Sequence, residues 1–149
     1  MSENLAQFPV IIKIPILWGY MDAYQHVNNV IFFRFFESVR IAYFDRIGFT
    51  TLKSSIGVGP ILASTECKYK IPLKYPDKVS IGAKITDLEE DRFTMKYILI
   101  SHQLNKLAAE AKAIVVSYDY NNDQKVPIPQ EIRNKIIELE NLFEWLYNL

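Results

Sequence analysis

Residues 29–47 form the longest apolar stretch of this chain and restrict its fold more than any other segment. The stretch reads NVIFFRFFESVRIAYFDRI, which places apolar side chains almost all round an α-helix. Asn28 or Asn29 is a suitable N-cap, and Gly48 stands where a left-handed residue commonly ends a helix. Roughly eighteen helical residues give a rod of about 27 Å, close to the width of a small domain. The rest of the chain is therefore expected to bury this helix on most of its faces.

Strand signals surround the helix. The first candidate, residues 8–18, contains Pro9 and Pro15 and is expected at a sheet edge or as a first strand, because proline cannot donate to a ladder. After a break at 57–60, the remaining candidates are residues 61–69, 78–86, 92–101 and 106–120. Short polar connections between them favour antiparallel pairing. A C-terminal amphipathic helix is predicted from the helical spacing of Ile132, Ile136, Leu139, Phe143 and Leu146. The elements together predict an α+β fold.

The totals exclude several classes of protein. A length of 149 residues suits one domain spanning 1–149, and 17 basic against 17 acidic side chains do not favour a nucleic-acid partner. The single cysteine, Cys67, rules out an intrachain disulfide framework and fits a reducing compartment. The N-terminus lacks the features of a signal peptide, and no apolar run reaches the roughly 20 residues that span a bilayer. We therefore expect a cytoplasmic protein without a membrane partner.

The segment directly before the helix, MDAYQHVNN from Met21 to Asn29, concentrates the most suggestive polar side chains. A carboxylate such as Asp22 can attack a carbonyl or activate a water. The helix start near Asn29 offers unpaired N–H groups and partial positive charge, which stabilise a developing oxyanion. The alternative reading is structural, since Asp and Asn are common turn and capping residues ahead of a helix.

With this order of elements and this motif, the chain resembles the hotdog-fold acyl-CoA thioesterases of the 4-hydroxybenzoyl-CoA thioesterase type. The run MDAYQHVNN precedes a long helix carrying Glu37 and Arg40, and it is also similar to a stretch of the plant acyl-ACP thioesterases. The run from Tyr69 to Asp77 resembles a strand and turn of the family, with Pro76 in place of a glycine. The resemblance covers roughly residues 11–120. It implies a hotdog fold, in which an antiparallel sheet wraps a long central helix, here followed by the C-terminal helix.

The resemblance also implies a reaction and an assembly. The expected reaction is hydrolysis of an acyl-CoA thioester to free acid and CoA, without a metal or a cofactor. Asp22 would act as general base or nucleophile, and the backbone of Asn29, seven residues later, would polarise the carbonyl. The expected assembly is a homodimer or a dimer-of-dimers tetramer, with paired sheets and active sites at the dimer interface. An aromatic content of 13% agrees with more apolar surface than one small monomer hides.

Two further catalytic candidates keep alternatives open. His26 matches a catalytic partner of the plant enzymes, but those enzymes carry an asparagine where this chain has Tyr24, so His26 either orients substrate or water or fixes the loop. Glu37 matches the offset at which a second thioesterase class places its catalytic glutamate. Its structural alternative is a buried ion pair with Arg34 or Arg40, supporting His26 or the loop.

The remaining assignments concern substrate binding and rival functions. Tyr24, Asn28 and Phe32 are expected to contact substrate, and Trp18 is a further candidate for the wall of an acyl tunnel. Cys67 is predicted to be a small buried strand residue, and His102 has no visible partner. The residues that could bind the CoA phosphates, which we do not rank, are Lys68, Lys70, Lys74 and Arg92. The rival functions are an acyl-ACP thioesterase, a hotdog dehydratase and a non-catalytic module that binds acyl-CoA.

Overall fold

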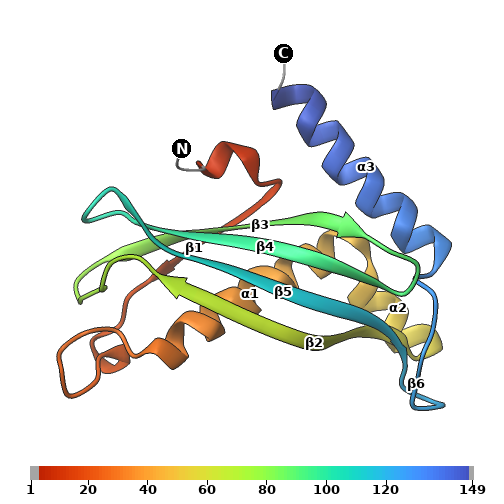
Figure 1. Ribbon diagram of the computed structural model, residues 1–149, viewed down its shortest axis with the longest axis horizontal. Helices are drawn as coiled ribbons and strands as arrows, with labels where there is room; N and C mark the ends of the chain where they lie inside the picture. Colours follow the sequence, from red (N-terminus) through yellow and green to blue (C-terminus); the bar gives the residue numbers. More distant parts are fainter. Residues whose placement is uncertain (1–3, 148–149) are drawn as a thin grey trace.

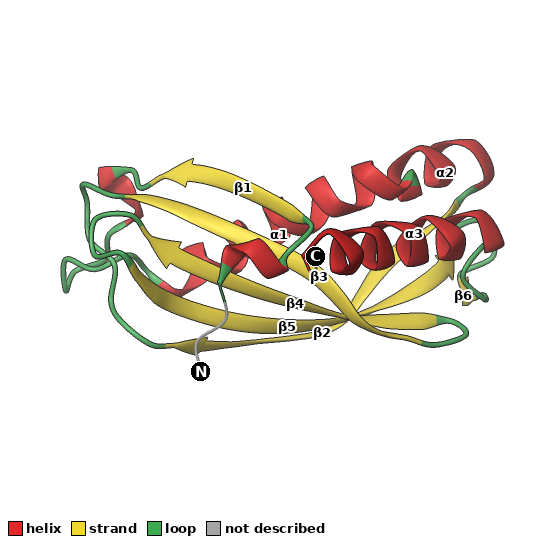
Figure 2. Ribbon diagram, turned by 90° about the horizontal axis from the view of Figure 1, so that it is seen from above, coloured by secondary structure: helices red, strands yellow, loops and turns green. Residues whose placement is uncertain are grey.

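One curved antiparallel sheet carries the helices on one of its faces (Figure 1, Figure 2). The computed structural model describes residues 4–147, with the backbone alone described for 143–147. The elements in chain order are η1 (Leu5–Gln7), β1 (Val10–Pro15), η2 (Trp18–Tyr20), α1 (Asn29–Ile47), α2 (Phe49–Ile56), β2 (Val58–Tyr69), β3 (Lys78–Leu88), β4 (Arg92–Ser101), β5 (Lys106–Asp119), β6 (Gln124–Lys125) and α3 (Gln130–Tyr147). The strand order is β1-β3-β4-β5-β2, with β6 paired to β5. This is the predicted α+β hotdog architecture, with the C-terminal helix present.

Helix α1 begins and ends where the sequence predicts. The Asn28 side chain accepts the Val30 N–H at 3.0 Å, so Asn28 is the N-cap, and Gly48 ends the helix with φ of 80°. The buried side chains form one broad stripe, comprising Phe32, Phe35, Phe36, Val39, Tyr43, Phe44 and Ile47. Val30 and Ile41 are 58% and 48% exposed, so the expectation of burial on most faces is wrong for one side of the helix.

No element is predicted between residue 48 and the break at 57–60, and the next strand is predicted to begin at residue 61. The structure differs on both points. Residues Phe49–Ile56 form the helix α2, which is too short for a clear periodic pattern and is held by the fully buried Phe49. Gly57, with φ of 77°, ends α2, but Val58 to Pro60 already pair with β5. A side chain at Gly59 would lie 2.8 Å from Lys53 Cβ, so this glycine allows α2 to approach β2 closely.

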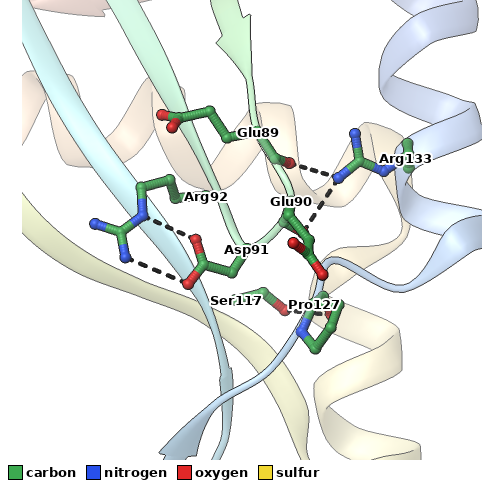
Figure 3. Close-up of polar contacts among 7 residues, drawn as sticks. All are labelled: Glu89, Glu90, Asp91, Arg92, Ser117, Pro127 and Arg133. Atoms are coloured by element: carbon green, nitrogen blue, oxygen red, sulfur yellow. Dashed lines mark hydrogen bonds and ion pairs between the residues drawn. The ribbon is translucent and has the colours of Figure 1, made fainter.

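Helix α3 covers the edge of β3 beyond Val10, the first residue of β1. Strand β1 pairs with β3 only as far as Ala83, and two residues later the Ile85 N–H donates to Glu140 Oε2 at 3.2 Å. The Tyr43 hydroxyl of α1 donates to the same oxygen of Glu140. At its other end α3 is tied to the β3–β4 turn, since Arg133 donates to the carbonyls of Glu89 and Glu90 (Figure 3). These contacts satisfy backbone groups along the β1 side of the sheet.

The predicted helix positions Ile132, Ile136 and Leu139 face the core, whereas the side chains of Phe143 and Leu146 lie outside the described part of the chain. None of the helices between residues 4 and 147 is long and apolar enough to cross a membrane.

Candidate active site

The loop between η2 and α1 is closed by its own hydrogen bonds. Met21 and Val27 form an isolated β-bridge, and the Asp22 N–H donates to the His26 carbonyl at 2.9 Å. Gln25 adopts a left-handed backbone with φ of 62°, which allows the chain to reverse within so few residues. The motif therefore folds as one compact loop ahead of α1.

Asp22 combines a turn role with a free oxygen. Its Oδ1 accepts the Tyr24 N–H at 2.9 Å, the geometry of an Asx-turn. Within the described chain no hydrogen bond uses Oδ2, and the side chain is exposed. The structural reading of Asp22 is thus compatible with a second role in which Oδ2 acts on substrate or water.

The first backbone N–H of α1 is unpaired. The Val30 N–H bonds to the Asn28 side chain and the Ile31 N–H to the Asn28 carbonyl. For the Asn29 N–H, the described residues provide no acceptor. An unpaired N–H at a helix start, in the positive end of the helix dipole, is suited to bind a carbonyl oxygen that becomes negative.

A cavity of about 290 Å³ opens beside this helix start. We call it the helix-start cavity. It is lined by His26, Val27, Asn29, Phe32, Tyr69, Lys70, Ile71 and Pro72. The rings of Phe32 and Tyr69 meet edge to face at 5.0 Å, and the Tyr69 hydroxyl donates to the Asn29 carbonyl at 3.4 Å. The strand end of β2 thus packs against the start of α1 and forms an aromatic wall.

The cavity brings together three of the residues singled out from sequence: His26, Asn29 and Phe32. Asp22 and Tyr24 do not line it, and Tyr24 and Trp18 are 83% and 72% exposed. The side-chain oxygen of Asn28, predicted to contact substrate, is occupied by its capping bond to Val30.

Glu37 lies in a different place. It lines a second cavity of about 290 Å³, the α1–β2 cavity, formed by Glu37, Arg40, Ile41, Phe44, Thr50, Lys53, Pro60, Leu62 and Val115. Glu37 is exposed, and the ion pairs of the described residues include none with Arg34 or Arg40. The predicted buried ion pair is therefore wrong, because this side of α1 faces the open cavity. Glu37 also lines a different cavity from His26, which does not favour a contact with the motif loop.

The structure also gives the surroundings of the other residues considered from sequence, namely the cysteine, the second histidine and the basic side chains. Burial raises the pKa of the Cys67 thiol to about 11, so the half-buried Cys67 is protonated at neutral pH and is a poor nucleophile. His102 has a partner after all, because its Nε2 lies 2.6 Å from Ser80 Oγ. Of the four basic residues considered for CoA, Lys70 alone lines the helix-start cavity, where it also pairs with Glu110. Among the described side chains, no three His, Cys, Asp or Glu residues lie close enough to share a metal ion.

Sequence reasoning missed Tyr69 and Arg40 as site residues. Tyr69 was noted only as part of a resembling strand, and Arg40 only as a possible partner of Glu37. The available signal was the spacing of Phe32, Glu37, Arg40 and Phe44 along one side of α1, but it does not reveal which strand lies opposite.

Comparison with known proteins identifies the family to which this fold belongs. The sequence profile of the thioesterase-like superfamily matches residues 16–136. A thioesterase from Thermus thermophilus, solved in complex with coenzyme A and Zn, is 27% identical, with a TM-score of 0.80 over 91% of this chain and 96% of that one. The PA2801 protein of Pseudomonas aeruginosa is 25% identical, with a TM-score of 0.77 over 87% of this chain and 98% of that chain. A relative from Aquifex aeolicus is 28% identical over 125 residues, 83% of this chain and 94% of that protein.

The matched residues run from Ile16, directly after β1, into α3, so they include the motif loop, α1 and both cavities. Because the fold and the family profile agree, the chain belongs to the thioesterase-like superfamily and is a hotdog-fold thioester hydrolase.

Proposed function

We propose that this protein hydrolyses acyl-CoA thioesters to a free acid and CoA at the start of α1. The observation that carries the proposal is the unpaired Asn29 N–H beside the helix-start cavity. The oxygen of a thioester carbonyl placed there accepts a hydrogen bond from this N–H. The dipole of α1 stabilises the negative charge that develops on that oxygen during the reaction. The CoA complex of the Thermus thermophilus relative supports CoA as the carrier of the acyl group.

Asp22 is the proposed catalytic carboxylate. As general base, its free Oδ2 takes a proton from the water that forms the new C–O bond. Collapse of the tetrahedral intermediate breaks the C–S bond, and the CoA thiolate leaves and recovers the proton. As nucleophile, the Asp22 carboxylate would instead attack the acyl carbon and expel the CoA thiolate, which leaves a mixed anhydride. Water then hydrolyses this anhydride to the free acid and restores the Asp22 carboxylate, and the thiolate takes up the released proton. His26 orients substrate or water, and Phe32 and Tyr24 contact the acyl group.

A second copy of the chain is part of the proposal. No strand in the described part of the chain pairs with the outer edge of β2 over its 12 residues, and Ile61, Leu62 and Tyr69 on this strand are 37–46% exposed. Pairing of two β2 edges would cover these side chains and bring a second protomer to both cavities, which gives the exposed Asp22 and Tyr24 a route to the site. We propose a homodimer or a dimer of dimers, each chain acting as one cytoplasmic hotdog domain without cofactor.

The test is thiol release from a panel of aryl-, short-, medium- and long-chain acyl-CoAs. We expect wild type to hydrolyse one class, and Asp22→Asn to reduce kcat by about 10²–10⁴-fold, the usual contribution of a general base. Glu37→Gln is the matched comparison, because it removes a carboxylate from the neighbouring cavity. Loss of activity in Glu37→Gln alone would move the catalytic carboxylate to α1.

Three rival functions are distinguished by further assays of the same proteins, with acyl-ACP as substrate, with acyl-CoA binding as the readout, and with hydration or dehydration as the reaction. Turnover of acyl-ACP but not acyl-CoA would assign the carrier-protein thioesterase. Binding of acyl-CoA without any turnover would assign the non-catalytic module. Hydration or dehydration of an acyl chain that is insensitive to Asp22→Asn would assign the dehydratase.

A further inference from the structure

Arg40 is a partly buried cation for which the described residues supply no carboxylate. Its Nη1 donates to the Tyr97 hydroxyl at 3.2 Å, and no other hydrogen bond or ion pair of Arg40 is present in that part of the chain. Tyr97 is fully buried, stacks on Phe36 at 5.4 Å, and donates its own proton toward Met95 Sδ. The hydroxyl fixes the guanidinium at the wall of the core but brings no negative charge.

The surroundings of Arg40 are apolar on one side and open on the other. Phe44, Leu62 and Val115 line the α1–β2 cavity together with Ile41 and Pro60. The other charged groups there are Glu37, which is exposed, and Lys53, whose Nζ lies 4.9 Å from the centroid of the Tyr120 ring. A guanidinium has five N–H donors arranged as a planar fork, and a buried charge is stable when it is paired. Glu37 lines the same cavity, but among the described residues no carboxylate forms an ion pair with this fork.

The two cavities lie along one seam between α1 and β2. Phe32 faces Tyr69 at the helix start, and further along the same helix Glu37 and Phe44 share a cavity with Leu62. Between them, Thr65 and Cys67 stand opposite Ala113 and Ala111 and share their face of the sheet. Thr65 is exposed on this inner face, so α1 does not close the seam.

The distance from Asn29 to Arg40 along the seam determines how long an acyl chain must be to reach both residues. Asn29 and Arg40 are eleven residues apart, which corresponds to about 17 Å along the helix axis. The Arg40 side chain leans toward the helix N-terminus and reduces that distance. An acyl chain of medium length, with its carbonyl at Asn29, would bring its far end to the guanidinium.

We propose that Arg40 binds a carboxylate at the far end of the acyl chain, so that the preferred substrates are CoA thioesters of medium-length dicarboxylic acids. This inference rests on the proposed function, because it places the carbonyl at Asn29. A carboxylate matches the guanidinium fork with two hydrogen bonds, and it replaces water around a cation that the fold leaves without a counter-charge.

The test compares two pairs of ligands. Suberoyl-CoA and octanoyl-CoA are hydrolysed in parallel, and their non-hydrolysable thioether analogues, one ending in a carboxylate and one in a methyl group, are titrated by calorimetry. The proteins are wild type, Arg40→Met, Arg40→Lys and Lys53→Met, each as the full chain. Arg40→Met keeps the side-chain bulk, and Arg40→Lys keeps the charge without the fork.

We expect wild type to prefer the carboxylate-ended ligand in both assays. Arg40→Met should lose about ten- to a hundredfold for that ligand, as for a lost charge-assisted hydrogen bond, and should bind the methyl-ended ligand as well as wild type. Arg40→Lys should lie between the two. Lys53→Met, the control for a second cation at the cavity, should change the preference less than about fivefold, because its ammonium is held over Tyr120.

Equal losses on both ligands in Arg40→Met, or a wild-type preference for the methyl-ended ligand, would overturn the inference. A changed oligomeric state of Arg40→Met in sedimentation velocity, with the ligand preference intact, would also overturn it and assign Arg40 to a carboxylate of a second copy. Retention of the preference in the thioether titrations without turnover of any thioester would contradict the hydrolase proposal alone.

Discussion

The two edges of the sheet are finished differently. At the β1 edge the strand has six residues and begins at Val10, opposite Ala83 of β3. Beyond that point the edge is covered by α3, whose Glu140 accepts the Ile85 N–H. At the other edge β2 runs for 12 residues, no strand within residues 4–147 pairs with its outer side, and Ile61 and Leu62 stay exposed. Among the described residues the chain covers one edge of the sheet and leaves the other open, where we propose that a second copy pairs. Both cavities border β2, so the proposed site lies on the side of the open edge.

The largest effect that we expect from the comparison is on stability at the β1 side. Phe8 is 1% exposed, and its ring lies so close to Gly82 that a Cβ there would meet Phe8 Cγ at 2.8 Å. Phe8→Ala should lower the free energy of unfolding by about 3–5 kcal/mol, while Phe8→Leu should cost much less. Urea denaturation measures both. Unchanged stability in Phe8→Ala would mean that packing at the β1 edge contributes little to the stability of the fold.

A second prediction concerns the chemistry of β2. The pKa of Cys67 is raised by burial from 9.0 to about 11, a difference of about two pH units. Because the thiolate is the reactive form, folded protein at pH 8 should react with iodoacetamide about a hundredfold more slowly than protein in urea. The folded rate should rise about tenfold per pH unit up to the pKa. Equal rates in the folded and unfolded protein at pH 8 would contradict the burial of this thiol.

The open edge can be blocked with a matched pair of substitutions. Ile61 on β2 and Ile11 on β1 both point to the sheet face turned away from α1 and are 37% and 43% exposed. Ile61→Lys should prevent edge pairing and reduce kcat/KM at least about tenfold, because lysine on an edge strand opposes association. Ile11→Lys should leave both the association of the chains and kcat/KM unchanged. Sedimentation velocity measures the oligomeric state, and thiol release measures kcat/KM. Equal oligomeric state and equal kcat/KM in the two variants would contradict the distinction between the edges.

The smallest expected effect is at the junction of β2 and α1. The Tyr69 hydroxyl donates to the Asn29 carbonyl at 3.4 Å, a long bond at an exposed position. Tyr69→Phe should lower kcat by less than about fivefold while retaining the ring against Phe32, whereas Tyr69→Ala should also raise KM. Steady-state kinetics distinguish these outcomes. A larger loss in Tyr69→Phe than in Tyr69→Ala would show that the hydroxyl, and not the aromatic wall, matters.

Predictions from the sequence succeeded where short-range signals decide the structure. The N-cap at Asn28, the left-handed end at Gly48 and the alternation in β3 and β4 depend on residues only a few positions apart. They failed for α2, whose eight residues depend on the buried Phe49, and for the ion pair of Glu37. The partner of His102 was equally invisible, because Ser80 is 22 residues away.

What the sequence determined by itself is the set of elements and the polar motif ahead of α1, since caps, periodicity and turn residues act locally. It placed His26, Asn29 and Phe32 near one another because they share one loop and the first turn of one helix. Only the tertiary structure decided that Tyr69 closes that cavity, that Arg40 lacks a carboxylate among the described residues, and that β2 is the open edge. Those features depend on which strand lies beside which helix, and such a choice is made by the packing of the whole core.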